Sequence, residues 1–165
     1  MALTWTTSST PVGELLLVTS PRGVARVAFA CEGFDEVRQS VAAATGETLV
    51  EGESEELETQ LAEYFAGERT AFDVALDWRL TQGFRARVQR ALIDIPYGET
   101  QSYADIALRL DNPKAVRAVG SGCASNPLPI LAPCHRVVRS DGSLGNYRGG
   151  AAMKKMLLEL ESGVA

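Results

Sequence analysis

The feature that most restricts the fold is an apolar segment, residues 126–132, that leads into Cys134 and the only histidine, His135. Pro127 and Pro129 stiffen this segment, because proline fixes φ and lacks a backbone donor. We expect it to be largely buried and to hold the thiol beside the imidazole. Thiolate is the reactive form, and little of a free cysteine is ionised near neutral pH, so a neighbouring base matters. These residues alone leave open a structural cysteine in a core strand beside a surface histidine, since buried inert cysteines are common.

Length and composition predict one large globular domain or two small ones. The chain has 165 residues, of which 45% are hydrophobic and 22% charged, which is ordinary for a soluble protein. No apolar run approaches the roughly 18 residues that a membrane span needs, and we expect no signal peptide and no membrane association. The scattered cysteines, Cys31, Cys123 and Cys134, predict a reducing, cytoplasmic location. With one histidine and no Cys-x-x-Cys, we expect no metal site and no cofactor.

The net charge of −5 conceals a difference between the two halves of the chain. Residues 1–83 hold five arginines and fourteen acidic residues, whereas residues 84–165 hold eleven basic and seven acidic ones. The first half is therefore at −9 and the second at +4. Phosphate would repel the first half, whereas the second could approach it, which permits a nucleic-acid partner without requiring one.

The first part of the chain predicts a small antiparallel sheet with two helices. Two apolar runs flank the turn sequence of residues 20–23, which favours a hairpin. The expected strands are residues 3–7, 15–19 and 24–29, and the expected helices are residues 34–44 and 57–65. A polar stretch then predicts a linker, so the expected boundaries are 1–72 for the first domain, 73–82 for the linker and 83–165 for the second domain.

The second part of the chain predicts mostly helices. Ser102 and Asp105 have the spacing of a capping box, and Asn112 with Pro113 matches an N-cap followed by the first helical residue. The expected helices are residues 84–93, a short helix that begins at Ser102, residues 114–122, and residues 151–161, which would bury Met153, Met156, Leu157 and Leu160. Two short helices joined by a tight break predict a helix-turn-helix.

The second helix of this pair, residues 114–122, is rich in alanine and glycine. It lacks the long amide and guanidinium side chains that read base edges in the major groove. Small side chains instead allow a backbone to lie close to a surface such as a minor groove. A helix packed against a neighbouring helix is the alternative.

Taken together, the motifs of the second half resemble those of the O6-alkylguanine-DNA alkyltransferases. They are Pro133-Cys-His-Arg-Val137, Arg117-Ala-Val-Gly120, Asn126-Pro127, Gly145-Asn-Tyr-x-Gly-Gly150 and Gly98-x-x-x-Ser102-Tyr103. The resemblance is dense from Ile95 to Glu161 and weak before residue 70. It implies an α+β fold, with an N-terminal α/β domain that is a ribonuclease-H-like roll with a small antiparallel sheet. The C-terminal domain would be mostly helical, with a winged-helix-like helix-turn-helix.

The resemblance also implies direct-reversal DNA repair by a single-turnover alkyltransferase. The Cys134 thiolate would displace the alkyl group from O6 of a flipped-out guanine by SN2 attack and keep it as a thioether, with O4-alkylthymine as a further substrate. By motif position, His135 would take the thiol proton through a water and Glu161 would orient the imidazole. Asn126 would support the cysteine turn, and Tyr103 would donate to N3 of the departing guanine. The sequence alone favours an exposed helix-end residue for Glu161, and a packed aromatic is the alternative for Tyr103.

The implied partner is double-stranded DNA bearing O6-alkylguanine, bound through the minor groove by a monomer. Arg117 would fill the space that the extruded base leaves. The other expected DNA-binding residues are Ala115, Ala118, Gly120, Asn112 and Ser140. The expected pocket residues are Tyr103, Pro129, Val137, Tyr147, Arg148 and Gly149, and we expect Arg148 at the rim to affect which alkyl groups fit.

Departures from the family pattern leave alternatives open. Gln89 stands where tryptophan is usual, Arg85 where glutamine is common, and Val116 where relatives often have a smaller residue. A related branch of the family binds alkylated DNA without reacting and has another residue at the cysteine position, whereas Cys134 is present here. The main alternative is a helix-turn-helix lesion-binding or regulatory protein. A thiol hydrolase is disfavoured, because adjacent side chains in a strand point apart.

Overall fold

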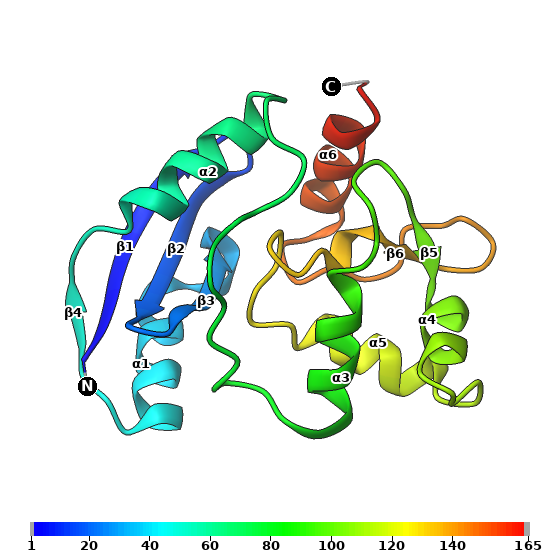
Figure 1. Cartoon of the computed structure of the whole chain (residues 1–165), viewed down its shortest axis with the longest axis horizontal. Coiled ribbons are helices and arrows are strands. Elements are labelled where there is room, and N and C mark those ends of the chain that lie inside the picture. Colours follow the sequence, from blue (N-terminus) through cyan, green and yellow to red (C-terminus); the bar gives the residue numbers. More distant parts are fainter. Residues whose placement is uncertain (1, 164–165) are drawn as a thin grey trace. The chain divides into compact units, whose positions relative to one another are not determined.

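Strands are concentrated before residue 52 and helices after it in the computed structural model, which describes residues 2–163 (Figure 1). The chain divides after Leu80 into two compact units. This boundary lies within the expected linker, residues 73–82. The first part of that stretch belongs to the first unit, because its backbone is hydrogen-bonded to β3 (Gly23–Phe29). Val24 N donates to Ala75 O at 2.9 Å, and Asp77 N donates to Val24 O at 2.8 Å. The first unit therefore extends to Leu80, eight residues beyond the expected boundary at 72.

The first unit contains a four-stranded sheet of order β3-β2-β1-β4. The strands are β1 (Leu3–Thr10), β2 (Gly13–Ser20), β3 (Gly23–Phe29) and β4 (Leu49–Glu51). The antiparallel pairing of β1 with β2 and of β2 with β3 confirms the expected hairpins. Strand β4 pairs parallel with β1 and was not predicted. Three residues, one of them charged, give too short a pattern for a strand to be recognised.

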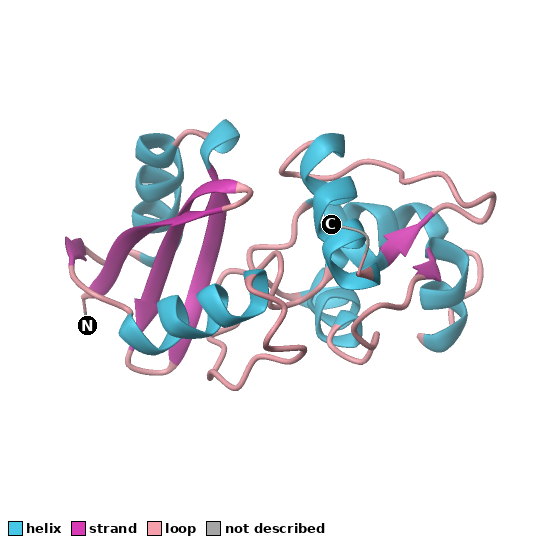
Figure 2. Ribbon diagram, turned by 90° about the horizontal axis from the view of Figure 1, so that it is seen from above, coloured by secondary structure: helices cyan, strands magenta, loops and turns pink. Residues whose placement is uncertain are grey.

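Helices α1 (Phe34–Thr45) and α2 (Glu55–Phe65) cover opposite faces of this sheet (Figure 2). A sheet covered on both faces can bury successive residues of a central strand, and residues 15–18 of β2 are all fully buried. Leu16 and Val18 belong to an apolar cluster with Val37 and Val41 of α1. A one-turn 3-10 helix, η1 (Ala30–Glu32), connects β3 to α1.

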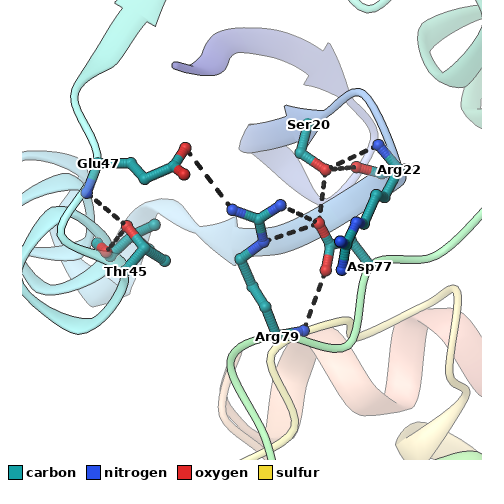
Figure 3. A network of polar contacts seen from close by, with 8 residues as sticks. Ser20, Arg22, Thr45, Glu47, Asp77 and Arg79 are labelled. Carbon is teal, nitrogen blue, oxygen red and sulfur yellow. Dashed lines mark hydrogen bonds and ion pairs between the residues drawn. The ribbon is translucent and has the colours of Figure 1, made fainter. Parts of the chain in front are cut away.

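Polar side chains fix the end of the first unit to its sheet (Figure 3). Asp77 accepts hydrogen bonds from Ser20 Oγ at 2.5 Å and from Arg79 Nε at 2.8 Å. Arg79 also lies 3.7 Å from Glu47. Burial opposes ionisation of Asp77, but the bonds from Arg79 and Ser20 outweigh it and hold the pKa of Asp77 below its usual value. The polar residues that suggested a solvated linker are therefore partners of one another.

The second unit is mostly helical, with a two-residue parallel strand pair. Its elements are α3 (Gly83–Leu92), β5 (Gln101–Ser102), α4 (Tyr103–Arg109), α5 (Val116–Ala124), η2 (Cys134–Arg136), β6 (Val137–Val138) and α6 (Ala151–Ser162). Gln101 pairs with Val137, and Ser102 with Val138. The strand that precedes α4 therefore lies beside the strand that follows the cysteine turn, and Tyr103 is brought to the neighbourhood of Cys134.

The first helix of the helix-turn-helix, α4, begins where the sequence predicts, but the second helix, α5, begins later than predicted. Ser102 Oγ accepts from Asp105 N at 3.0 Å, and Ser102 N donates to Asp105 Oδ2 at 2.9 Å, which confirms the capping box. The expected N-cap at Asn112 is wrong, because the N-cap of α5 is Ala115. Asn112 O accepts from Ala115 N in a separate turn, so Pro113 lies outside the helix.

The buried face of α6 also differs from the expected stripe of methionines and leucines. Met156 is 39% exposed, whereas Lys154, Leu157 and Glu161 are buried. The three buried positions follow helical spacing, but two of them carry charges, which sequence patterns assign to solvent. Lys154 is hydrogen-bonded to Val137 O, and Glu161 is paired with Arg136, so both buried charges have partners inside the second unit.

Helices α3 and α5 pack closely at Gly122. A Cβ atom at this position would come within 2.9 Å of the Val88 side chain. Beside this contact, the fully buried Gln89 donates from Nε2 to Gly122 O at 3.0 Å. Gln89, one of the departures noted above, therefore makes a specific bond to the backbone of α5.

Within residues 2–163, no helix is both long enough and apolar enough to cross a membrane.

Candidate active site

The loop before the cysteine is held from inside by one asparagine. Asn126 is 1% exposed; its Nδ2 donates to Ala132 O at 2.8 Å, and its Oδ1 accepts from Leu128 N at 3.0 Å. Ile130 has a φ of 74°. This left-handed conformation is unfavourable for a β-branched residue and costs roughly 1–3 kcal/mol. The surrounding bonds must outweigh that cost, so the loop has one imposed shape.

Cys134 follows this loop as the first residue of η2 and is 3% exposed. Its N–H donates to Ala132 O at 2.8 Å. Burial raises the pKa of the Cys134 thiol above its usual value, while a hydrogen bond from Asn126 and the charges of Lys154 and Arg148 oppose the rise. The resting group is a thiol, so a proton acceptor is needed to make it a nucleophile.

His135, Arg136 and Glu161 form a buried polar network behind the cysteine. His135 Nε2 lies 2.7 Å from Glu161 Oε2. Arg136 donates to both oxygens of the same carboxylate, from Nε to Oε1 at 2.8 Å and from Nη2 to Oε2 at 2.9 Å. Its Nη1 donates to Ile95 O at 2.6 Å. The bidentate cation keeps Glu161 ionised in a region that solvent does not reach.

The network fixes which imidazole nitrogen can accept a proton. A carboxylate only accepts hydrogen bonds, so His135 Nε2 must carry the hydrogen and donate to Glu161. Nδ1 of the neutral ring is then a bare lone pair, and it has no hydrogen-bond partner among residues 2–163. A buried acceptor without a partner, one residue from the thiol, is suited to receive the thiol proton.

The single histidine makes this assignment directly measurable. Burial lowers the pKa of His135 below its usual value of 6.5, against the opposing effect of Glu161. We expect ¹⁵N NMR of the imidazole to show one signal pair with Nε2 protonated and Nδ1 not, and a titration midpoint below that value. Because the unfolded chain takes up the proton at the higher pKa, stability is expected to fall as pH drops below about 6.5. An Nδ1–H tautomer would contradict this arrangement.

Tyr103 connects the cysteine cluster to an open hollow of about 470 Å³. It packs against the apolar cluster that contains Cys134. The hollow is lined by Tyr103, Val116, Arg117, Gly120, Ser121, Ala124, Arg139, Gly145 and Asn146. Its volume lies in the range of about 300–1,000 Å³ that small-molecule sites occupy. Burial raises the pKa of Tyr103 to about 12, so the phenol remains a hydrogen-bond donor at neutral pH.

Gly145 is required where it faces this tyrosine. It has a φ of 75°, and a Cβ atom there would come within 2.8 Å of Tyr103 Oη. A larger residue would therefore combine an unfavourable backbone conformation with a displaced phenol. This contact gives a structural reason for the first glycine of the Gly145-Asn-Tyr motif.

Lys154 is a charged residue of the site that the sequence did not indicate. It is fully buried; its Nζ donates to Val137 O at 2.6 Å and lies 5.8 Å from the centroid of the Tyr103 ring. Burial lowers the pKa of the ammonium group, while the two cysteines raise it. The only sequence signal was its spacing of seven residues from Glu161 on one helix face.

The structure brings together the five residues expected to carry the chemistry, Cys134, His135, Glu161, Asn126 and Tyr103, in one unit. Among the expected pocket residues, only Tyr103 lines the hollow. Pro129, Val137 and Gly149 are buried, and Tyr147 is half-buried. Arg148 is exposed, and its Nη1 donates to Asn126 O at 3.1 Å.

The residues expected to meet DNA lie on or near α5. Arg117 and Gly120 line the hollow. Arg117, Asn112 and Ser140 are exposed, and Ala115, Ala118 and Gly120 are half-buried. Arg139, which sequence reasoning passed over in favour of its neighbour Ser140, also lines the hollow.

Comparisons with known proteins cover nearly the whole chain. The model described as the ribonuclease-like domain of 6-O-methylguanine DNA methyltransferase matches residues 3–78, and the one described as its DNA binding domain matches residues 83–163. The methylated-DNA–protein-cysteine methyltransferase of Mycobacterium bovis is 54% identical over 102 residues, 62% of this chain and 61% of the relative. This match therefore spans less than two thirds of that relative. The constitutive enzyme of that name from Bacillus subtilis is 40% identical over 158 residues, 95% of this chain and 94% of the relative.

Solved structures agree with this match. A crystal structure of the Mycobacterium tuberculosis O6-methylguanine methyltransferase has a TM-score of 0.85 at 39% identity, covering 99% of this chain and 94% of that one. A crystal structure of the M. tuberculosis OGT in complex with DNA has a TM-score of 0.84 at 39% identity, covering 100% and 95%. The α+β fold expected from the sequence is thereby confirmed.

Proposed function

The chain belongs to the 6-O-methylguanine DNA methyltransferase family, and we propose that it repairs DNA by moving the alkyl group of O6-alkylguanine onto Cys134. The proposal rests on two neighbouring groups. The buried Cys134 is a protonated thiol, and Nδ1 of the next residue, His135, has no hydrogen-bond partner among residues 2–163. A structural cysteine in a core needs no such acceptor. Names and DNA complexes of the relatives support the same conclusion.

The proposed reaction is a single displacement. The Cys134 proton passes through a water to Nδ1 of His135, the sulfur forms a bond to the alkyl carbon, and the bond from that carbon to O6 breaks. Guanine leaves with the electron pair, and the Tyr103 phenol donates toward its N3 to offset the charge. The product is a thioether, which has no electrophilic carbonyl for water to attack. Each molecule therefore repairs one lesion.

Lys154 is proposed to support charge separation in this step. Its ammonium group is one of two cations, with Arg148, whose charge lowers the pKa of the buried Cys134 thiol, against the larger effect of burial. A fixed cation in a region of low dielectric stabilises a developing anion more strongly than the same cation in water. Lys154 is held by Val137 O, at the end of the cysteine turn.

DNA is proposed to meet the second unit along α5. The target carbon is inaccessible in a stacked duplex, so the base must be extruded, at a cost of a few kcal/mol. Arg117 would take the vacated place in the stack, while the small residues Ala115, Ala118 and Gly120 let α5 approach the minor groove. The extruded base would enter the hollow at Tyr103. O4-alkylthymine offers the same chemistry, and a monomer is sufficient for it.

The cysteines support a reducing location for this chemistry. Cys123 and Cys134 are both buried free thiols. A protein whose acceptor must stay reduced suits the cytoplasm, where thiols are maintained.

Intact-protein mass spectrometry tests the proposal. After incubation with a duplex that contains O6-methylguanine, we expect a permanent gain of one methyl group on the protein and restored guanine in the DNA. The Cys134→Ala variant is expected to bind the same duplex and to gain nothing, because the acceptor sulfur is gone. Cys123→Ala, which removes the other buried thiol, serves as the matched control and is expected to retain the gain. Unchanged mass despite binding would instead identify a lesion-binding protein.

A further inference from the structure

Two arginines line the hollow beside Tyr103, and the proposed transfer reaction uses only one of them. Arg117 comes from α5, and Arg139 follows β6 directly. Neither guanidinium group makes a hydrogen bond or an ion pair with any of residues 2–163. Arg139 acts on Asp141 through its charge, but the Asp141 carboxylate accepts its hydrogen bonds from Ser143, at 2.9 and 2.7 Å.

Some other arginines of the chain do pair with acidic residues. Among them, Arg38 pairs with Asp35, Arg69 with Glu63, Arg79 with Asp77, and Arg109 with Asp94. A guanidinium group is a planar fork of donors that suits phosphate oxygens. Two such groups with their donors open to solvent, at the rim of one hollow, form an anion-binding feature.

The backbone that carries Arg139 is fixed by a tight turn. Arg139 N donates to Ser143 O at 2.9 Å, and Gly142 N donates to Arg139 O at 2.9 Å. The residue before it, Val138, is paired with Ser102 at the start of α4. These hydrogen bonds hold the backbone at Arg139 in place. Less conformational entropy is therefore lost when its side chain binds a ligand.

We propose that Arg139 binds a backbone phosphate of DNA, that of the nucleotide whose base enters the hollow or of its immediate neighbour. The inference rests on the proposed function, since it requires a nucleotide at this hollow. A base that leaves the stack brings its phosphate to the rim of the pocket that receives it. Arg139 would bind that phosphate while Arg117 occupies the gap in the duplex. The contact fixes position and carries no sequence information.

The salt dependence of DNA binding tests this contact. With the full chain and an O6-methylguanine duplex, Arg139→Gln is expected to weaken binding and to reduce the slope of log affinity against log salt by about 0.9, the value for one phosphate. Arg139→Lys should keep most of the slope. Arg85→Gln removes the same charge from an exposed position on α3 away from the hollow and is the matched control, expected to leave the slope unchanged. Transfer from free O6-benzylguanine should be unaffected in Arg85→Gln.

Neutral methylphosphonate linkages, placed singly around the lesion, locate the phosphate. At one position next to the lesion, the substitution is expected to weaken binding by the wild-type protein but not by Arg139→Gln, because both changes remove the same contact. Equal slopes for wild type and Arg139→Gln, or additive losses at every linkage, would overturn the inference. Failure of the wild-type protein to gain mass on the same duplex would instead overturn the proposed function.

Discussion

Replacing Arg136 by methionine is expected to lower the free energy of unfolding of the second unit by about 3–5 kcal/mol. The guanidinium group is the bidentate partner of Glu161 and bonds the carbonyl of Ile95. It also lies 5.7 Å from the centroid of the Tyr97 ring. Its removal leaves a carboxylate buried at 1% side-chain exposure without its bidentate cation. Substitutions that leave a buried charge without its counter-ion are among those that lower the free energy of unfolding most.

Urea unfolding followed by the His135 imidazole signal measures this loss, because the only histidine lies in the second unit. Lys155→Met on the same helix is the control. Its ion pair with Glu159 is exposed, and we expect a change within about 0.5 kcal/mol. Adding Glu161→Gln to Arg136→Met should recover part of the stability, since the buried carboxylate that lost its cation is then a neutral amide. If the double variant is less stable than Arg136→Met, the charge explanation is wrong.

Replacing His135 by glutamine is expected to slow alkyl transfer about 10²–10⁴-fold at neutral pH, the range for loss of a general base. Burial raises the pKa of the Cys134 thiol, so without an internal acceptor the thiolate forms only at alkaline pH. The deficit should therefore shrink as pH rises and hydroxide replaces the base. In the wild-type protein, the rate should fall on the acid side only below the usual histidine value of 6.5, because the pKa of His135 is lowered.

Single-turnover reaction with free O6-benzylguanine across pH measures both profiles without a DNA-binding step. Glu161→Gln keeps a hydrogen-bond acceptor for the imidazole and is expected to lie between wild type and His135→Gln. A deficit for His135→Gln that is constant across pH would show that the imidazole only supports the fold of the turn. The melting temperature of each variant separates that outcome from a loss of folded protein.

Local patterns predicted the parts of the fold that local chemistry determines. The turn at residues 20–23 gave the β2–β3 hairpin, and the spacing of Ser102 and Asp105 gave the start of α4. Asn112 and Pro113 have equally good helix-start chemistry, but the chain uses them for a separate turn. More than one local structure suits these residues, so helix-start chemistry alone does not determine where α5 begins.

The site was predictable where a motif names the residue, and not where burial reverses its usual behaviour. Cys134, His135 and Asn126 stand together along the chain. Lys154 and Glu161 lie on a helix whose apolar pattern points elsewhere, and such a pattern assigns a charged residue to solvent. The family resemblance alone indicated Glu161, and nothing indicated Lys154. Only the folded chain shows that Val137 O and Arg136 satisfy them in the interior. The positive φ of Ile130 gives no sequence signal at all.

The pairing of β5 with β6 has a mechanical consequence. One strand ends where α4 begins, and the other begins where the cysteine turn ends. A displacement of α4 would therefore be transmitted through the two residue pairs of β5 and β6 to the turn that carries Cys134. No loop intervenes between β5 and α4, or between the cysteine turn and β6. In the proposed reaction, DNA bound at α4 and α5 would thus be coupled through β5 and β6 to the position of the Cys134 sulfur.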